Sequence, residues 1–422
     1  MNEEAAELGV DIEQVSDIDI NNVARNTEEL ARLLASDLND IVLSQGEFEI
    51  DGFDFNSPKT ISGVGRDKTR IKINGISCNA LVTIKDAIIS SLDNKKSAIE
   101  SVGFNGSIEL FNIDEENLDL LRSFKIRRLK DIGILELSEK EEFILDETVE
   151  INYKELNIRN VSFVSKAASG FIFKKCTGKI ENCSFSYSGE VALKDGDKPA
   201  SIIHLEESHI TIGNSEIKNG IRQGIYSVNS ELLIRDCLIF NNRTFAIFCS
   251  NNSNLKIQSS DIHGNGTKGS LYSQIWIMSS IAEINASKIY DSLGGSGLSA
   301  DGKSKVSLTK SEVYKNKEFG LYIGGSTLSI DDSSIYQNGT KGKHFQQIYL
   351  KSSTAAIKNS KAGEGFGYSI GAEKNSNLAI GNSRVDKLIY DPSSEIRANN
   401  DCAIGESRKT FGVFSIYNAN LK

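Results

Sequence analysis

Residues 155–390 alternate apolar and polar positions in short segments that recur about every 23 residues. Each segment reads apolar, any residue, polar, Ser or Cys, any residue, apolar, as in 180–185 (IENCSF) and 330–335 (IDDSSI). Taking the small residue as a marker defines ten repeats, marked by Val161, Cys183, Ser215, Cys237, Ser260, Ser287, Ser311, Ser333, Ser360 and Ser383. Successive markers are 22, 32, 22, 23, 27, 24, 22, 27 and 23 residues apart, so a few repeats carry insertions.

Two further columns appear when the repeats are aligned on these markers. An apolar residue stands three positions before the marker, and a second small residue stands seven before it: Cys176, Ser208, Ser230, Ser253, Ser280, Ser304, Ser326, Ser353 and Ser376. The period of two is typical of strands with one face inward and excludes a helix. Strands this short stack in parallel, at about 4.8 Å per repeat, rather than forming hairpins. The sequence therefore predicts an all-β parallel solenoid whose ten coils extend about 48 Å.

These columns resemble those of the right-handed parallel β-helix superfamily, whose best-known members are pectate-lyase-like. The resemblance covers residues 40–400 and implies a right-handed parallel β-helix solenoid. The superfamily contains lyases, hydrolases, epimerases and esterases, and also members without catalytic activity. The resemblance therefore implies an architecture and leaves the activity open.

The first residues predict how the solenoid begins. Asn26 followed by Glu29 is typical of a helix start, and Leu30, Leu33 and Leu34 then fall on one helix face. Such a helix would cap the open end of the core. We expect an N-terminal segment with this capping helix at 1–39, the β-helix at 40–390, and a C-terminal closing segment at 391–422. Within the β-helix, the coils should be irregular at 80–150 and regular at 155–390.

Composition and charge exclude several functional classes. The 422-residue chain has a net charge of −9, which argues against non-specific binding to nucleic acid or to anionic membranes. No run of 18 apolar residues occurs, so membrane insertion is not expected. The acidic first residues predict no secretory leader. The compartment stays open: extracellular if a leader has been removed, cytoplasmic otherwise.

The six cysteines predict neither a metal site nor a disulfide framework. No Cys-x-x-Cys occurs, and no His lies at zinc-ligand spacing from a Cys pair. Three of the cysteines, Cys176, Cys183 and Cys237, occupy columns that otherwise hold Ser. We therefore expect buried, unpaired thiols. No cofactor is predicted, and the sequence does not support a Ca²⁺ site.

The catalytic motifs of polysaccharide-active β-helix enzymes are missing. Arg70-Ile71-Lys72 occurs in the first coils, far from any paired Asp, and Asp331-Asp332 has no accompanying Gly-His-Gly. Neither the Asp-Pro-His of alginate epimerases nor the Arg-x-Pro-x-x-Arg of pectate lyases is present. Whether the chain is an enzyme therefore stays undecided; if it is one, a polysaccharide lyase, an epimerase or a glycoside hydrolase is expected.

Two outward columns are rich in aromatic residues. The first contains His204, Tyr226, Phe248, Trp276, Ser299, Tyr322, Tyr349 and Ser369, and the second contains Lys218, Phe240, His263, Tyr290, Tyr314 and Tyr336. Aromatic rings on a flat face bind the C–H faces of sugars, so we take Tyr226, Phe248, Trp276, Tyr322 and Tyr349 as candidate binding residues. Alternatively, these rings form cross-coil stacks that only stabilise the ladder.

A loop is duplicated beside the first aromatic column. Residues 265–269 and 338–342 both read NGTKG, are 73 residues apart, and precede a Gln-Ile-aromatic strand. Three coils would separate the two loops by about 14 Å. As binding elements, Lys268 and Lys341 would flank a groove for an anionic sugar; alternatively, the loops only record an internal duplication with a turn-forming Asn-Gly.

Two residues of the second aromatic column are candidates for catalysis. His263 and Tyr290 are neighbours there, and such a pair can serve as acid and base in the β-elimination of uronates. The alternative, which we favour, is a chance surface His beside a Tyr in a tyrosine-rich column. The turn asparagines, Asn219, Asn241, Asn242, Asn265, Asn316 and Asn338, are expected to be structural.

The leading hypothesis is a β-helix that binds a polysaccharide along its aromatic face, with processing of that polysaccharide left open. The alternative is a non-catalytic protein-interaction or structural rod within a larger surface or fibre assembly. The expected partner is accordingly a polysaccharide or a protein. The sequence does not predict the oligomeric state.

Overall fold

The computed structural model divides into two compact units, Met1–Ile132 and Gly133–Lys422, which we describe separately. It describes residues 20–65, 68–74, 76–78, 80–91, 99–102, 107–111, 114–115, 126, 129–130, 133–189, 200–342 and 344–410. Most of the predicted irregular region up to residue 132, and the last part of the predicted closing segment, lie outside these residues. No helix among them is long and apolar enough to span a membrane.

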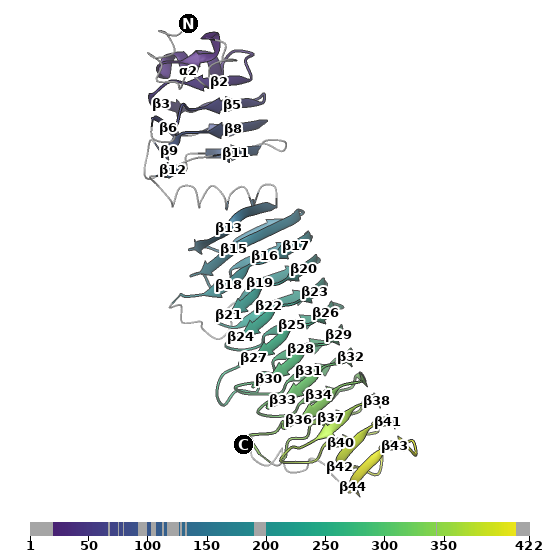
Figure 1. Ribbon diagram of the computed structural model, residues 1–422. Helices are drawn as coiled ribbons and strands as arrows, with labels where there is room; N and C mark the ends of the chain where they lie inside the picture. Colours follow the sequence, from purple (N-terminus) through teal and green to yellow (C-terminus); the bar gives the residue numbers. More distant parts are fainter. Residues whose placement is uncertain are drawn as a thin grey trace. The chain divides into compact units, whose positions relative to one another are not determined.

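The N-terminal unit consists of a short helix and three small parallel sheets (Figure 1). Its elements are η2 (Ile20–Asn22), β1 (Val23–Ala24), α2 (Thr27–Leu34), β2 (Asp40–Leu43), β3 (Gly46–Asp51), β4 (Asp54–Phe55), β5 (Lys59–Ser62), β6 (Thr69–Asn74), β7 (Ile76–Cys78), β8 (Leu81–Lys85), β9 (Ile88–Ser91), β10 (Ile99–Val102), β11 (Ser107–Phe111) and β12 (Asp114–Glu115). The sheets are ordered β1-β2-β5-β8-β11, β10-β7-β4 and β12-β9-β6-β3.

Helix α2 begins as its sequence predicts. The Asn26 side chain accepts a hydrogen bond from the Glu29 amide, and the Glu29 carboxylate accepts one from the Arg25 amide. Leu30, Leu33 and Leu34 are buried in one cluster with core residues of β2, β3 and β5. The reciprocal cap supplies partners to backbone N–H groups that the helix itself cannot satisfy, and the apolar face covers the unit's core.

The C-terminal unit is a parallel β-helix of three faces, in which each coil pairs with the next (Figure 1). It begins with β13 (Ile134–Leu145), β14 (Val149–Asn152) and β15 (Glu155–Ser165), and β15 pairs with the first strands of both face 2 and face 3. It ends with β42 (Arg384–Tyr390), β43 (Glu395–Ala398) and β44 (Ala403–Lys409).

The faces between these ends are defined by their strands. Face 1 comprises β16 (Phe171–Lys174), β19 (Ser201–Glu206), β22 (Gln223–Val228), β25 (Ile247–Ser250), β28 (Ile275–Met278), β31 (Leu298–Asp301), β34 (Leu321–Gly324), β37 (Ile348–Lys351) and β40 (Ile370–Glu373). Face 2 comprises β17 (Thr177–Glu181), β20 (His209–Gly213), β23 (Glu231–Arg235), β26 (Asn254–Gln258), β29 (Ile281–Asn285), β32 (Lys305–Thr309), β35 (Thr327–Asp331), β38 (Thr354–Lys358) and β41 (Asn377–Gly381). Face 3 comprises β18 (Ser184–Tyr187), β21 (Glu216–Lys218), β24 (Leu238–Phe240), β27 (Asp261–His263), β30 (Lys288–Tyr290), β33 (Glu312–Tyr314), β36 (Ser334–Tyr336) and β39 (Lys361–Gly363).

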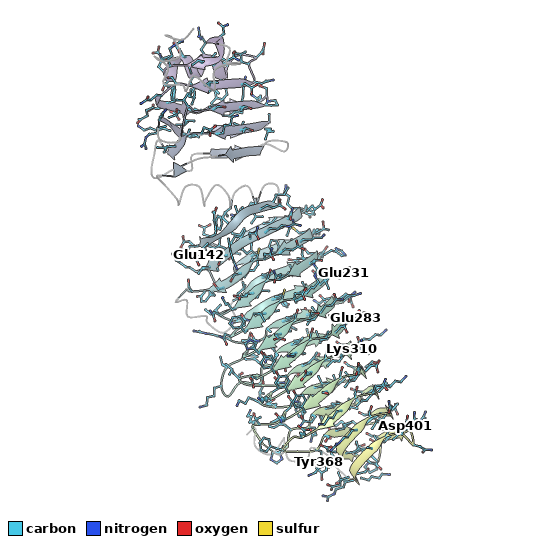
Figure 2. The ribbon with its side chains drawn as sticks, viewed as in Figure 1. Glu142, Glu231, Glu283, Lys310, Tyr368 and Asp401 are labelled. Carbon is cyan, nitrogen blue, oxygen red and sulfur yellow. The ribbon has the colours of Figure 1, made fainter. Side chains whose placement is uncertain are left out.

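The core of this unit consists of the predicted apolar columns. On face 2 the residues three before each marker are in register and almost completely buried, for example Ile212, Ile234 and Ile257. Side chains at the alternate positions point outward, as Glu231 and Glu283 do in Figure 2. The parallel β-helix that the repeat pattern predicts is therefore confirmed.

The small columns form two hydrogen-bonded ladders at the corners beside face 2. In the first, the amide of each residue donates to the side-chain oxygen of the next coil, from Cys176 to Ser208 (3.0 Å) and on to Ser394. In the second, the amide of Cys183 donates to Ser215 Oγ, and the amide of Ser260 to Ser287 Oγ. Small residues recur because a larger side chain would displace these buried bonds.

The cysteines have the structural role expected of them. Cys176, Cys183, Cys237 and Cys249 are buried and unpaired, and Cys402 is unpaired and partly exposed. The thiol of Cys402 approaches the carbonyl of Ile380, as Cys237 approaches that of Ile212, so Cys402 extends the second ladder. The side chain of Cys78 lies outside the described residues.

Asparagines build a third ladder at the corner between faces 3 and 1. Asn265 Oδ1 accepts from the amide of Asn242, and Asn265 Nδ2 donates to Gln274 Oε1. Asn338 Oδ1 accepts from the amide of Asn316, and Asn338 Nδ2 donates to Gln347 Oε1. These four asparagines are 0% exposed, which fits a structural role. Asn219 and Asn241 instead adopt positive φ, at 62° and 57°, and make the turn before the ladder position.

Candidate functional site

The first aromatic column runs along the outward side of face 1. Strand register aligns His204, Tyr226, Phe248, Trp276, Ser299, Tyr322, Tyr349 and Gly371 across successive coils. The expectation that Ser369 ends this column is wrong, because Ser369 lies in the turn before β40 and Gly371 takes the outward position. The remaining members are confirmed as neighbours.

Ser299 divides this column into two aromatic blocks. Tyr226 stacks on Phe248 at 5.1 Å between ring centroids, and Phe248 stacks on Trp276 at 4.9 Å. Tyr322 and Tyr349 lie on the other side of Ser299, 5.4 Å apart. One indole face of Trp276 is covered by Phe248, while the opposite face is directed toward the coil of Ser299. Tyr322 and Trp276 are two coils apart, about 10 Å.

Loops supply a second row of rings beside the column. Phe245 lies 5.2 Å from Trp276 and 5.1 Å from Tyr272. In the other block, Phe319 lies 5.1 Å from Tyr349 and 5.2 Å from Phe345. The sequence alignment missed this row because its members occur in only some of the turns. They do stand at constant offsets: Phe245 and Phe319 come three positions before the outward residue of the next strand, and Tyr272 and Phe345 come four positions before it.

In each block, a carboxylate one coil further on accepts a hydrogen bond from the N–H or O–H group of an aromatic side chain. Trp276 Nε1 donates to Asp301 Oδ2 at 3.0 Å, and the Tyr349 hydroxyl donates to Glu373 Oε1. Burial, together with this bond to Glu373, raises the pKa of Tyr349, so its hydroxyl stays protonated. The two rings are thereby fixed against rotation.

The two blocks differ in how much of their surface is open. Phe319, Phe345 and Tyr349 are buried in one cluster, with Tyr349 only 4% exposed. In the block of Trp276, by contrast, Tyr272 is 40% exposed and the preceding Leu271 is 60% exposed. Of the predicted binding residues, Tyr226, Phe248, Trp276 and Tyr322 are therefore accessible from solvent in part, while Tyr349 is enclosed.

The two lysines of the duplicated loops are both on the surface but differ in their contacts. Lys341 Nζ pairs with Glu318 Oε1 at 2.9 Å, and the Glu318 side chain is 8% exposed. Lys268 is exposed, and within the described part of the chain it forms no ion pair. The structure thus places both lysines at the corner that leads into face 1.

His263 and Tyr290 lie on face 3 and not with the residues of face 1. Their rings stack at 4.9 Å within a continuous column of Phe240, His263, Tyr290, Tyr314 and Tyr336. Burial lowers the pKa of His263 despite the nearby Asp261 and Asp291, and burial together with these carboxylates raises the pKa of Tyr290. The imidazole is therefore held neutral and the phenol protonated.

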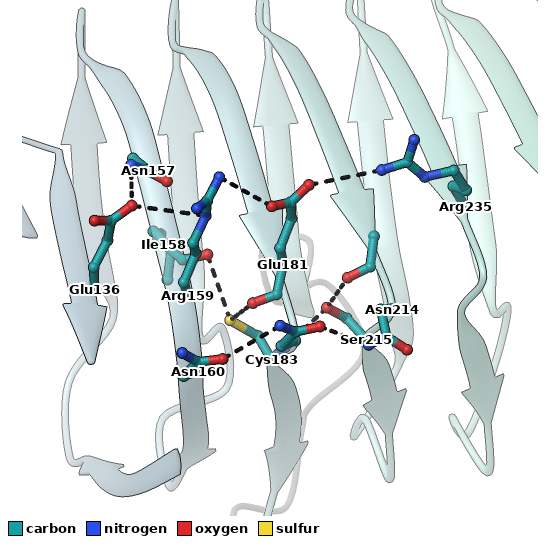
Figure 3. Close-up of polar contacts among 12 residues, drawn as sticks. Glu136, Asn157, Ile158, Arg159, Asn160, Glu181, Cys183, Asn214, Ser215 and Arg235 are labelled. Carbon is teal, nitrogen blue, oxygen red and sulfur yellow. Dashed lines mark hydrogen bonds and ion pairs between the residues drawn. The ribbon is translucent and has the colours of Figure 1, made fainter. Parts of the chain in front are cut away.

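Charged side chains form a separate column on face 2. Arg159 Nη2 lies 3.2 Å from Glu181 Oε2, and Arg235 Nη2 lies 3.6 Å from Glu181 Oε1 (Figure 3). Gly213 separates Glu181 from Arg235 in register, which leaves a shallow depression of about 340 Å³. The charges already neutralise each other at the surface, where such pairs contribute little to stability.

The described residues contain no group of three or more His, Cys, Asp or Glu side chains that could hold a metal ion. Face 1 presents aromatic rings, the carboxylates of Asp301 and Glu373, and the flanking lysines of the two loops. Such a surface can bind a ligand with apolar C–H faces and hydroxyl groups.

Comparisons with known proteins agree with this architecture. A family model described as "Right handed beta helix region" matches residues 145–275 and 273–404. No curated protein matches the chain.

Three solved structures match the chain at low identity and low TM-score. The chain is 12% identical to the Azotobacter vinelandii mannuronan C-5 epimerase AlgE4 A-module, covering 93% of this chain and 97% of that chain with a TM-score of 0.31. It is 12% identical to the periplasmic alginate epimerase AlgG (97% and 88% covered, TM-score 0.36). It is also 12% identical to the enzymatically active domain of bacteriophage CBA120 tailspike protein 2 (63% and 47% covered, TM-score 0.40).

Proposed function

The chain belongs to the right-handed β-helix family, and on this premise we propose that face 1 binds a polysaccharide whose sugar rings stack on Trp276. The observation that carries this proposal is the break in the aromatic column at Ser299. Within a continuous stack every inner ring has both faces covered, and only its edge meets solvent. At Trp276 the stack stops, so one indole face has no aromatic neighbour in the described structure.

The spacing across the break suits a sugar. Trp276 and Tyr322 are about 10 Å apart, and carbon atoms in contact lie about 3.5–4.0 Å from each other. A single sugar ring midway in this gap would lie about 5 Å from each aromatic ring, which is close to the 4.9 Å and 5.4 Å that separate neighbouring rings of the column. The C–H bonds of a pyranose lie on its two faces and carry partial positive charge, which complements the negative face of an aromatic ring.

Polar groups at the break suit the hydroxyls of the same sugar. Ser273 Oγ and Ser299 Oγ form a hydrogen bond of 2.7 Å at the break. Asp301 Oδ2 accepts the hydrogen bond from Trp276 Nε1. Asp301 Oδ1 receives no hydrogen bond from any described residue, so it can accept one from a sugar hydroxyl. A few fixed polar groups beside an aromatic platform are typical of ligand sites.

Binding to a glycan array tests the proposal, with Trp276→Ala as the variant. Removing the indole should weaken binding about tenfold, because the stacking contact is worth about 1.5 kcal/mol. Tyr314→Ala is the matched control, since it removes a ring from face 3 and should leave binding unchanged. Circular dichroism confirms that both variants are folded.

The result can also go against polysaccharide binding. If no glycan binds to the unmodified protein, or if Trp276→Ala binds as well as the unmodified protein does, face 1 has no such role. If Trp276→Ala keeps glycan binding and Tyr314→Ala loses it, the binding site lies on face 3.

A further inference from the structure

Three tyrosines end the aromatic column on face 3. Tyr290, Tyr314 and Tyr336 occupy the same position in successive coils, so their Cα atoms are paired in the strand register. The rings of Tyr314 and Tyr336 lie 5.1 Å apart between centroids, and their planes differ by 7°. Equivalent carbons of these two phenols, including the ortho carbons beside the hydroxyl group, are therefore about 5 Å apart.

We propose that Tyr314 and Tyr336 form a site of oxidative cross-linking, at which a haem peroxidase with hydrogen peroxide joins the two phenols as dityrosine. This inference is independent of glycan binding on face 1. Each phenol gives up one electron and one proton, and the two radicals form a carbon–carbon bond between their ortho positions. The hydrogens on these two carbons then move to the oxygens and restore the phenols. Hydrogen peroxide takes up the two electrons and the two protons and becomes two molecules of water.

A carboxylate is in place to accept one of these protons. The Tyr336 hydroxyl donates to Glu312 Oε2 at 2.7 Å, and Glu312 stands two residues before Tyr314 on β33. Burial and this hydrogen bond raise the pKa of Tyr336, so its phenol is protonated before oxidation. A phenol that loses an electron becomes a strong acid, and a carboxylate within hydrogen-bond distance can take its proton as the electron leaves.

The ring of Tyr336 is the last of the column, which leaves it able to turn. The next coil has Gly363 at the matching position, so no further ring stacks on Tyr336 in the described structure. The carboxylate of Asp386 lies against Gly363 instead. Tyr314 and Tyr336 are both half-buried, so one edge of each ring meets solvent and an oxidant can reach it. The two rings can then turn about their side-chain bonds until the ortho carbons meet.

The tyrosine pair on face 1 shows the opposite situation. Tyr322 and Tyr349 lie at a similar distance, 5.4 Å, but their planes are inclined by 44°. Tyr349 is 4% exposed, and the rings of Phe319 and Phe345 pack around it. Its hydroxyl also has a carboxylate partner, Glu373. We nevertheless expect no cross-link there, because the enclosed ring can neither meet an oxidant nor turn toward Tyr322.

The experiment treats the full chain with a haem peroxidase and hydrogen peroxide and follows dityrosine by its fluorescence. Separation by size under denaturing conditions then distinguishes links within one chain from links between chains. Tryptic digestion of the monomer should give peptide 311–315 joined to peptide 318–341, and fragmentation of the second peptide distinguishes Tyr336 from Tyr322. A monomer without this linked pair overturns the inference, and so does a main product that joins Tyr290 to Tyr314.

Variants that keep the stack test each role separately. Tyr336→Phe should abolish the link, whereas Tyr290→Phe, its matched control at the other neighbour of Tyr314, should keep it. Glu312→Gln still accepts the hydrogen bond but cannot take up the proton, so the link should form about tenfold more slowly. Glu283→Gln, on face 2, controls for the loss of a surface charge. An unchanged yield of dityrosine in Tyr336→Phe would overturn the site, and an unchanged rate in Glu312→Gln would overturn the role of its carboxylate.

Discussion

The indole nitrogen of Trp276 donates a 3.0 Å hydrogen bond to Oδ2 of Asp301, which lies one coil further along face 1. The equivalent bond in the other aromatic block joins Tyr349 to Glu373. Both carboxylates fix a ring in one rotamer before any ligand arrives, and such preorganisation lowers the entropy cost of binding. The regular spacing of the coils places Asp301 where it can hold the indole, and this preorganisation should raise the affinity of the proposed site for its ligand.

Asp301→Ala should weaken polysaccharide binding about threefold to fivefold, because the indole loses its anchor and a hydroxyl loses an acceptor. Asp301→Asn retains an amide oxygen that can accept from the indole, so we expect its affinity to lie close to that of the unmodified protein. Titration calorimetry with the best ligand from the glycan array measures both. Equal affinities for the alanine variant and the unmodified protein would show that the anchor is unimportant.

The column on face 3 should contribute stability and not binding. Tyr314 stacks on Tyr290 at 4.9 Å and on Tyr336 at 5.1 Å, with nearly parallel planes. Tyr314→Ala removes both contacts and should lower the free energy of unfolding by about 1–2 kcal/mol. Urea denaturation measures this loss. An unchanged unfolding midpoint would mean that the stack is only incidental.

The sequence predicts the coils well and the site only in part. Aromatic residues such as Trp276 could be aligned because strand register is fixed by period-two burial, and Asp301 could have been found two positions beyond Ser299 on the same strand. The enclosure of Tyr349 could not be predicted, because it depends on Phe319 and Phe345, which come from turns outside the strands. The turns differ in length from coil to coil, so the spacing of the repeat does not show which of their side chains pack against a strand.

A similar limit applies to the asparagines of the turns. Asn241 and Asn242 are adjacent and chemically identical, yet one adopts a positive φ and the other is completely buried in the ladder. Repeat spacing places both near the same corner. Counted from the markers, Asn242 and Asn265 both stand five positions on, whereas Asn219 and Asn241 both stand four positions on, so the alignment separates the two columns. It does not show which column faces inward, because that depends on the backbone conformation of the turn.

The asparagine ladder should be the most sensitive polar element of the C-terminal unit. Asn265 accepts from the amide of Asn242 and donates to the carbonyl of Ile239 and to Gln274, all without contact with solvent. Asn265→Ala leaves these groups unpaired and creates a small cavity, at a cost of about 3 kcal/mol. Asn285→Ala, at an exposed position of face 2, is the control and should change stability by less than about 0.5 kcal/mol. Similar midpoints for the two variants in urea would contradict a structural ladder.

Stability should decrease as the pH falls from 7.5 to 5.5, in part because of His263. Burial lowers the pKa of this imidazole, while Asp261 and Asp291 oppose the shift. The unfolded chain therefore takes up a proton at a higher pH than the folded chain does, so acidification favours unfolding as the pH passes below the unfolded pKa of about 6.5. His263→Phe preserves the stack with Phe240 and Tyr290 and should reduce this dependence. Thermal melts across the interval measure it; an identical pH slope in the variant would exclude a contribution from His263.

The buried thiols should resist modification until the C-terminal unit unfolds. Burial raises the pKa of Cys183 and Cys237 to about 11 and that of Cys249 to about 12. At pH 8, about one thiol in a thousand at Cys183 would be ionised, and the thiolate is the form that reacts.

Cys402 is partly exposed, so it should be alkylated by iodoacetamide in the folded protein. Cys183, Cys237 and Cys249 are buried and should be alkylated only in denaturant. Peptide mass spectrometry resolves the sites individually, and Cys402→Ser should abolish the early labelling on this peptide without altering the rest. Rapid alkylation of Cys237 in the folded protein would show that the second small-residue ladder opens readily, contrary to the continuous hydrogen bonding that joins it to Ser260.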